Sequence, residues 1–243
     1  MRTFSITDVG MVRQVNQDYV FEGGRPLGIL RNLFVVADGM GGHQAGELAS
    51  KLVADTVKNW MMNEFNPEMD YVEAGEMIRR AFLEANTLVY ERSRHNPALS
   101  GMGTTATLAM IYREKLITVH VGDSRSYLIG DNISQITRDH SLVQELLSRG
   151  EISREAAANH PNKNCITRAV GAEPDIKVDV GIRSYQGETV LLCSDGLTNV
   201  VSDEQIYDII TAEEDLQSGA EELVALANKK GGPDNITVVV FQK

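Results

Sequence analysis

Cysteines and long hydrophobic runs are scarce in this chain. Only Cys165 and Cys193 occur among 243 residues, without the close spacing of a zinc or redox motif. This argues against a disulfide-stabilised scaffold and favours reduced thiols. No apolar run approaches the roughly 18 residues of a membrane helix, and the first residues lack the apolar stretch of a signal peptide. We therefore expect a cytoplasmic protein that does not insert into a membrane.

Basic side chains are also in short supply. The sequence has 23 Lys and Arg against 34 Asp and Glu, a formal net charge of −11. Binding to nucleic acid or to anionic lipid depends on clustered positive charge, so the composition argues against both partners. The 42% hydrophobic and 23% charged content, with 6 prolines, is that of an ordinary globular protein. We expect one compact domain over residues 1–243, acting as a monomer.

The hydrophobic pattern predicts strands and helices in groups. Two long segments repeat apolar residues every three or four positions, which is typical of amphipathic helices. Short β-prone runs separated by Gly, Asp and Asn predict antiparallel strands. Helices are expected at 46–65, 78–89, 142–147, 203–210 and 216–229, and strands at 33–37, 104–112, 116–121, 126–129, 133–137, 176–182, 189–193 and 237–241. This grouping favours antiparallel sheets with helices packed outside. We interpret residues 141–171 as an appended flap subdomain.

Four aspartates stand where apolar runs stop or start: Asp38, Asp123, Asp195 and Asp234. Each one alone could be a turn residue. If the strand ends converge, however, carboxylates about 5 Å apart repel by roughly 3 kcal/mol per pair at an effective dielectric constant of about 20, and divalent cations would offset this. Oxygen-only ligands select Mg²⁺ or Mn²⁺, and two such ions can hold a nucleophilic hydroxide. Calcium is the structural alternative, but no calcium-binding loop of the helix–loop–helix type is present.

Two further segments add candidate site groups. The run from Asp38 to His43 is a glycine-rich turn whose carbonyl groups can reach a metal and whose histidine can lie at the lip of the site. Near the N-terminus, Arg13 precedes Asp18 by five residues. Taken alone, Arg13 could be a solvated surface charge and His43 a residue that starts a helix.

Together these segments resemble a known family, the metal-dependent protein Ser/Thr phosphatases of type 2C (PPM), in its bacterial form. The resemblance spans nearly the whole chain, and its motifs stand in the family's order. They are Arg13-x-x-Asn16-Gln17-Asp18, Asp38-Gly39-Met40-Gly41-Gly42-His43, Gly103-Thr104-Thr105, Val121-Gly122-Asp123-Ser124-Arg125, Thr137-Arg138-Asp139-His140-Ser141, Leu192-Cys193-Ser194-Asp195-Gly196-Leu197 and Asp234-Asn235-Ile236-Thr237.

The resemblance implies an α+β fold, a four-layer αββα sandwich of two antiparallel sheets with helices on both outer faces. It also implies two tightly bound Mn²⁺ or Mg²⁺ ions and a third, weaker one. The implied ligands of the first two are Asp38, the Gly39 carbonyl, Asp195 and Asp234, and those of the third are Asp123 and Asp195. Arg13 would grip the phosphate, and Asp18 would act through water.

Two positions depart from the animal-type pattern of the family. Gln17 stands where that pattern has Glu, and Met40 follows Asp38-Gly39 where that pattern has His. His43 is then the candidate general acid for the leaving serine or threonine oxygen.

The reaction that the resemblance implies is hydrolysis of phosphoserine and phosphothreonine in proteins by direct attack of a metal-bridging hydroxide on phosphorus. The partners would be a bacterial Ser/Thr protein kinase and its substrates, in signal transduction. Two alternatives remain. One is a phosphatase dedicated to a single stress or sigma-factor regulator, and the other is a non-catalytic interaction domain of the same fold.

Overall fold

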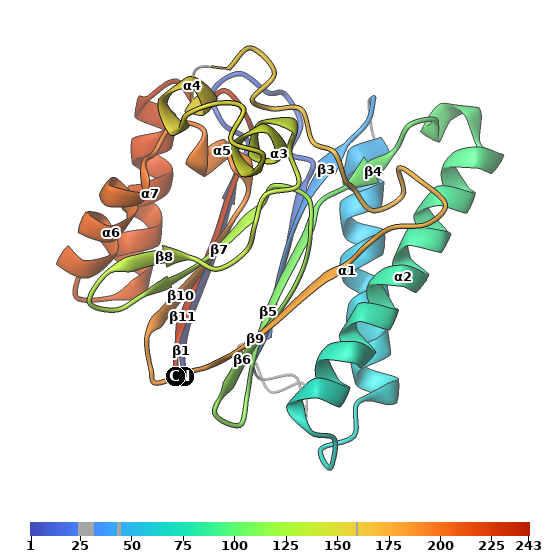
Figure 1. Cartoon of the computed structure of the whole chain (residues 1–243), viewed down its shortest axis with the longest axis horizontal. Helices are drawn as coiled ribbons and strands as arrows, with labels where there is room; N and C mark the ends of the chain where they lie inside the picture. The colour runs from blue at the N-terminus through green and yellow to red at the C-terminus, as the bar shows by residue number, and fades with distance from the viewer. Residues whose placement is uncertain (24–31, 43–44, 159) are drawn as a thin grey trace.

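The computed structural model describes residues 1–23, 32–42, 45–158 and 160–243. Two antiparallel sheets pack face to face, and long helices cover both outer faces (Figure 1). This confirms the expected four-layer αββα sandwich of the α+β class. The two chain ends lie together because the first strand pairs with the last, Arg2 opposite Gln242.

The first sheet joins the two ends of the chain. Its order is β1 (Arg2–Asp8), β11 (Ile236–Gln242), β10 (Thr189–Cys193), β7 (Arg125–Ile129) and β8 (Ile133–Gln135). The helices on its outer face are α5 (Asp195–Thr198), α6 (Asp203–Ala212) and α7 (Leu216–Lys229). Ser202 and Gln205 form a capping box that starts α6.

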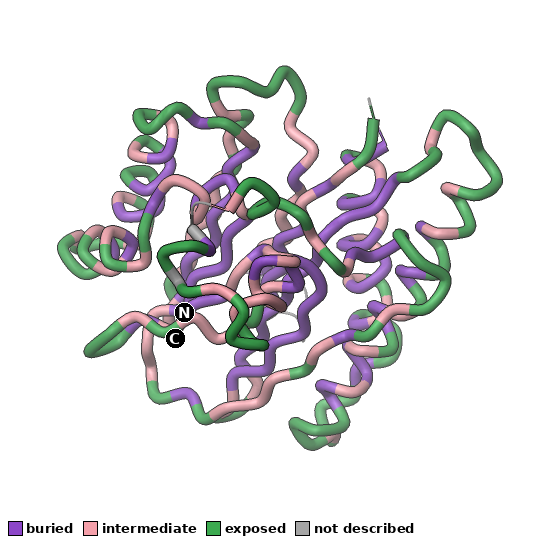
Figure 2. Tube along the Cα trace, turned by 45° about the horizontal axis from the view of Figure 1, so that its top comes forward, coloured by how far each residue is buried: buried purple, intermediate pink, exposed green. Residues whose placement is uncertain are grey.

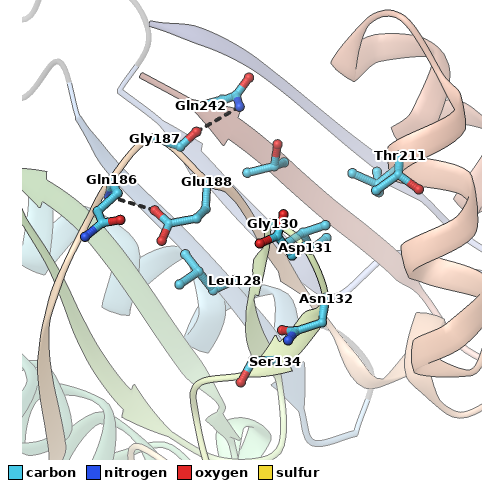
Figure 3. Close-up of a pocket in the computed structure, with 13 residues that line it drawn as sticks. Leu128, Gly130, Asp131, Asn132, Ser134, Gln186, Gly187, Glu188, Thr211 and Gln242 are labelled. Atoms are coloured by element: carbon cyan, nitrogen blue, oxygen red, sulfur yellow. Dashed lines mark hydrogen bonds between the residues drawn. The ribbon is translucent and has the colours of Figure 1, made fainter.

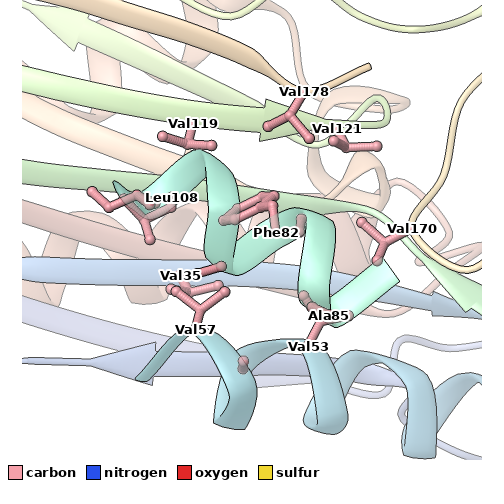
Figure 4. Packing of buried hydrophobic residues seen from close by; sticks show 14 of the residues in the cluster. Val35, Val53, Val57, Phe82, Ala85, Leu108, Val119, Val121, Val170 and Val178 are labelled. Carbon is pink, nitrogen blue, oxygen red and sulfur yellow. The ribbon is translucent and has the colours of Figure 1, made fainter. Parts of the chain in front are cut away.

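The second sheet comes mostly from the N-terminal half. Its order is β2 (Asp18–Glu22), β3 (Leu33–Met40), β5 (Ala106–Tyr112), β6 (Lys115–Val121) and β9 (Asp179–Ser184), with β4 (Gly103–Thr104) pairing with the end of β3. Its outer face carries α1 (Ala45–Glu64) and α2 (Tyr71–His95), which pack on it through a hydrophobic core (Figure 4). Asp70 caps α2 in a second capping box, with Glu73 as the partner.

A third core lies between the sheets, where the rings of Phe34 and Phe241 stack with their centroids 3.9 Å apart. Strand β3 is therefore covered on both faces, which explains its continuous run of buried residues from Leu33 to Ala37. Figure 2 shows the result as buried strands inside a shell of helices with exposed outer sides. No helix among the described residues is both long and apolar enough to span a bilayer.

The structure also differs from the expected elements in places. Strands β1 and β2 and the helices α4 (Arg154–Ala158) and α5 were not predicted, and β9 begins three residues later than expected. The expected strand 104–112 is divided at Thr105 into β4 and β5, which both pair with β3 in the same register. Strand β9 contains few apolar residues. Asp179 to Ser184 pair with β6, whereas the more apolar Ile176 and Val178 precede the strand.

Candidate metal centre

All four aspartates at strand ends line one cavity of about 290 Å³. Asp38 comes from β3, Asp123 from the β6–β7 turn, Asp195 from the start of α5 and Asp234 from the loop before β11. Antiparallel order brings these segments to the same end of the sandwich. Arg13, Gln17, Gly39, Met40, Gly41, Thr105, Asn164, Ile166 and Asn235 complete the lining.

The backbone around Asp38 is held from both sides. Its N–H donates to Thr105 Oγ1 at 3.0 Å, and its carbonyl accepts from the Thr105 N–H at 2.9 Å and from Thr104 Oγ1 at 2.8 Å. A Cβ on the next residue, Gly39, would lie 2.1 Å from the Gly46 carbonyl oxygen. Only glycine lets the start of α1 approach the turn at Gly39 so closely.

Asp18 lies directly opposite Asp38 in the β2–β3 pair. Its Oδ2 accepts hydrogen bonds of 2.7 Å from Ser194 Oγ and from Thr237 Oγ1. Its Oδ1 is buried and has no hydrogen-bond partner among the described groups. Burial raises the pKa of Asp18 to about 6, although the hydroxyl donors lower it.

Asp195 begins α5 and accepts from Asn199 Nδ2 at 2.9 Å through Oδ2. Its Oδ1 is buried and meets no donor within the described part of the chain. Burial first, and then the charge of Asp234, raise the pKa of the Asp195 carboxyl group above its ordinary value. An added cation would lower this pKa, because it favours the ionised form.

Asp123 follows Gly122, which has a positive φ of 113° and leaves no room for a Cβ beside Thr105. His140 holds this turn twice: its N–H donates to the Gly122 carbonyl at 2.7 Å, and its Nδ1 accepts from the Gly122 N–H at 3.0 Å. His140 stands within one of the sequence motifs, but the motif alone indicates no role for it. Its pairing with Gly122, 18 residues away, becomes visible only in the fold.

The Arg13 guanidinium reaches the cavity from the loop that precedes β2, and its Nη2 lies 2.8 Å from Asp234 Oδ2. This loop is held by Asn235, whose Nδ2 donates to the carbonyls of Val9 at 2.9 Å and Val15 at 3.0 Å, and whose Oδ1 accepts from the Gln17 N–H at 2.8 Å. Asn235 is a motif residue in the sequence, but its position there does not reveal this structural role.

Burial and mutual repulsion disfavour the ionised form of two carboxyl groups at the cavity, those of Asp38 and Asp123. Burial first, and then the charges of Asp18 and Asp195, raise the pKa of Asp38 well above its ordinary value. Burial and the charge of Asp195 raise the pKa of Asp123 to about 8. A divalent cation would remove this repulsion, because it favours the ionised form of every neighbouring carboxyl group.

The donor set fits Mg²⁺ or Mn²⁺ because its charged ligands are all carboxylates and a backbone carbonyl adjoins them. In the described ranges, however, no three Asp, Glu, His or Cys side chains already enclose a point as the ligands of one ion would. Asp234 instead bonds Arg13, and one oxygen of Asp195 bonds Asn199. Asp195 Oδ1 is buried without a hydrogen-bond partner among the described residues, so a bound ion would satisfy this atom most directly.

His43, the candidate general acid, lies outside the described residues. A larger pocket, of about 650 Å³, lies at the other end of the sandwich (Figure 3). There the Gln242 amide donates to the Gly187 carbonyl at 2.8 Å, and the Gln186 N–H donates to Glu188 at 2.7 Å. Its lining residues include no cationic side chain, so the cavity with Arg13 is the better phosphate site.

Comparisons with known proteins identify the family of this chain. The family model described as protein phosphatase 2C matches residues 12–231. The serine/threonine phosphatase stp of Listeria welshimeri is 39% identical over 242 residues, covering 98% of this chain and 94% of the relative. The protein phosphatase PhpP of Streptococcus pneumoniae is 40% identical over 238 residues, covering 97% of this chain and 94% of the relative.

Solved structures give the same result. Serine/threonine phosphatase Stp1 from Staphylococcus aureus superposes with a TM-score of 0.91 at 33% identity, covering 99% of this chain and 94% of that one. The catalytic domain of the serine/threonine protein phosphatase PstP, solved in complex with two manganese ions, has a TM-score of 0.84 at 35% identity, covering 98% and 96%. The chain therefore belongs to the protein phosphatase 2C family, as a bacterial protein serine/threonine phosphatase.

Proposed function

We propose that this enzyme removes phosphate from phosphoserine and phosphothreonine in proteins at a centre of two tightly bound Mn²⁺ or Mg²⁺ ions and a third, weaker one. Asp38, the Gly39 carbonyl, Asp195 and Asp234 would hold the first two ions, and Asp123 with Asp195 the third. The observation that carries the proposal is the meeting of these four aspartates and Arg13, from distant parts of the chain, at one cavity.

When bound, the ions would supply an activated hydroxide as the nucleophile and would neutralise charge on the phosphoryl oxygens. The chain's own contribution begins with Arg13. Its guanidinium is half exposed and already lies at the cavity, where it can donate two hydrogen bonds to a phosphoryl group. Asp234 keeps it pointed inward through the 2.8 Å contact.

Asp18 is suited to act one layer behind the ions. Ser194 and Thr237 fix its Oδ2, which leaves the buried Oδ1 available to accept a hydrogen bond from water at the site. A carboxylate that orients water in this way holds the nucleophile's position and takes no proton itself.

His43 is proposed to protonate the departing serine or threonine oxygen. This oxygen is a strongly basic leaving group, whereas p-nitrophenolate leaves without a proton. His43→Ala is therefore expected to slow phosphothreonine peptides about 10²–10⁴-fold more than p-nitrophenyl phosphate. Equal losses on both substrates would assign His43 a purely structural role.

In the cell, the proposed partners are a Ser/Thr protein kinase and the phosphoproteins that it makes, in the cytoplasm. The segment 141–171 is proposed to act as a flap at the substrate side of the cavity. In its support, Asn164 and Ile166 line the cavity beside the aspartates, and α3 (Leu142–Ser148) and α4 lie at the same end of the sandwich (Figure 1).

The direct test is phosphate release from a phosphothreonine peptide, with Mn²⁺ and with a chelator. We expect turnover only with Mn²⁺, and a loss of about a hundredfold or more in Asp38→Asn. Asp131→Asn is the matched control, because this exposed carboxylate lies at the opposite end of the sandwich. Full activity of Asp38→Asn, or of the wild type in chelator, would refute the metal-dependent mechanism.

A further inference from the structure

Four large apolar residues are exposed around Arg13: Val9, Met11, Val12 and Val15. We call them the apolar rim. Met11 and Val12, which precede Arg13, are 68% and 67% exposed, and Val15 is 48% exposed. Ten large hydrophobic residues of the described chain are exposed, and four of these ten fall within one seven-residue stretch. Isolated apolar residues are normal on a protein surface, but such a concentration is typical of a binding site.

The rim does not owe its exposure to a loose backbone. The Met11 N–H donates to the Gly232 carbonyl at 2.8 Å, and Asn235 holds the carbonyls of Val9 and Val15. Gly10, with a φ of 79°, packs its backbone against Asp234, where any Cβ would lie 2.2 Å from the carbonyl oxygen. The fold thus fixes these apolar side chains in water, which is unfavourable unless something covers them.

The rim is continuous with the catalytic cavity through Arg13. The Arg13 guanidinium is 2.8 Å from Asp234, so a phosphoryl group that it contacts lies at the cavity. Consecutive Cα atoms are about 3.8 Å apart, so the substrate residues within two positions of the phosphorylated one lie within reach of the chain neighbours of Arg13. Arg13 is also the one charged residue between positions 9 and 17, so charged flanking residues find no ionic partner in this stretch.

We propose that the apolar rim is a substrate subsite, which binds an aliphatic side chain within about two residues of the phosphorylated serine or threonine. This inference rests on the proposed function and narrows its substrates to phosphoproteins with Leu, Ile, Val or Met beside the phosphorylated residue. The substrate itself is the occupant, because a phosphate that contacts Arg13 brings the flanking substrate residues beside this surface.

The test compares two phosphothreonine peptides that differ only in the two residues on each side, leucine in one and serine in the other. Burial of an aliphatic side chain gives wild-type enzyme about a tenfold preference in kcat/KM for the leucine peptide. In Met11→Ser/Val12→Ser this ratio falls to about twofold or less. The control Met62→Ser/Val72→Ser keeps the tenfold ratio, since it changes the same residue types on α1 and α2, 52% and 55% exposed.

Because the readout is a ratio, it is independent of how much active enzyme each preparation contains. Equal kcat/KM for the two peptides in the wild type, or a tenfold ratio that survives in Met11→Ser/Val12→Ser, would overturn the subsite. A dimer in sedimentation that this variant dissolves without changing the ratio would show that a second copy covers the rim, and would also overturn it. Hydrolysis of neither peptide with Mn²⁺ would instead mean that the proposed function fails.

Discussion

Asp18 and Asp38 stand opposite each other on neighbouring strands, and both have a raised pKa. Both belong to motifs found in the sequence. Asp38 lines the cavity with Asp195, and Asp18 lies behind it on the neighbouring strand. The hydroxyls that fix Asp18 come from Ser194 and Thr237, about two hundred residues further along the chain. That part of the site could not be predicted, because a hydrogen bond between distant segments leaves no local pattern.

The raised pKa values predict how the metal-free protein responds to pH. A carboxyl group whose pKa rises on folding opposes the folded state once it must ionise, so stability is lost as the pH rises. The pKa of about 6 for Asp18 and of about 8 for Asp123 set the window, from about pH 4 to about pH 8. We expect the Tm in chelator to fall across this window, and to fall less in Asp123→Asn. A Tm in chelator that does not fall, or an identical slope in the variant, would contradict this assignment.

Gly39 supplies a second residue-scale prediction. A Cβ there would lie 2.1 Å from the Gly46 carbonyl oxygen and 2.5 Å from that of Gln17, both backbone atoms that cannot move aside cheaply. Gly39→Ala is expected to lower the free energy of unfolding by about 2 kcal/mol or more. Gly42→Ala is the control, because a Cβ there meets no atom of the described residues within 4 Å. Urea denaturation of the two variants makes the comparison, and equal stabilities would show that the turn adjusts freely.

Among the elements, the long helices and the buried strands were predictable, and the short or edge elements were not. The repeat of apolar residues placed 216–229 at the bounds of α7. Strands β1 and β2 were missed although β1 alternates Phe4 and Ile6, which face the α7 side, with Thr3 and Ser5, which bond Glu22. Its pairing partner β11 lies at the other end of the chain, so the strand is defined by a contact that local sequence does not reveal.

The flap proposal is tested at the level of its elements. Between Leu142 and Ile166, buried side chains are few among the described residues, whereas β10 is buried from Val190 to Cys193. The segment is tied down at its ends, by bridges from Ser141 to Ile166 and from Thr104 to Val170. We expect amide exchange to be faster in α3 and α4 than in β10 by at least about a hundredfold, because local opening there exposes little apolar surface. Exchange as slow as in β10 would show a packed loop instead of a flap.

At the scale of the whole molecule, the sandwich explains why seven short motifs spread over the chain serve one reaction. Strands β3, β7, β10 and β11 each have one end at the cavity with the aspartates. Strands β7, β10 and β11 have their other ends at the larger pocket around Gly130 and Glu188. The motif residues predicted that the aspartates meet at one end of the sandwich. The hydrogen bonds between Asn235 and the Arg13 loop become visible only in the assembled fold.

The central claim is that the aspartate cavity is a metal centre. Isothermal titration of metal-free protein with Mn²⁺ tests it most directly. The account predicts two tight binding events in the wild type and fewer than two in Asp38→Asn, with each bound ion adding about 2.7 kcal/mol to the unfolding free energy at a hundredfold excess over its Kd. No saturable binding in the wild type, or unchanged stoichiometry in Asp38→Asn while Asp131→Asn behaves identically, would contradict it.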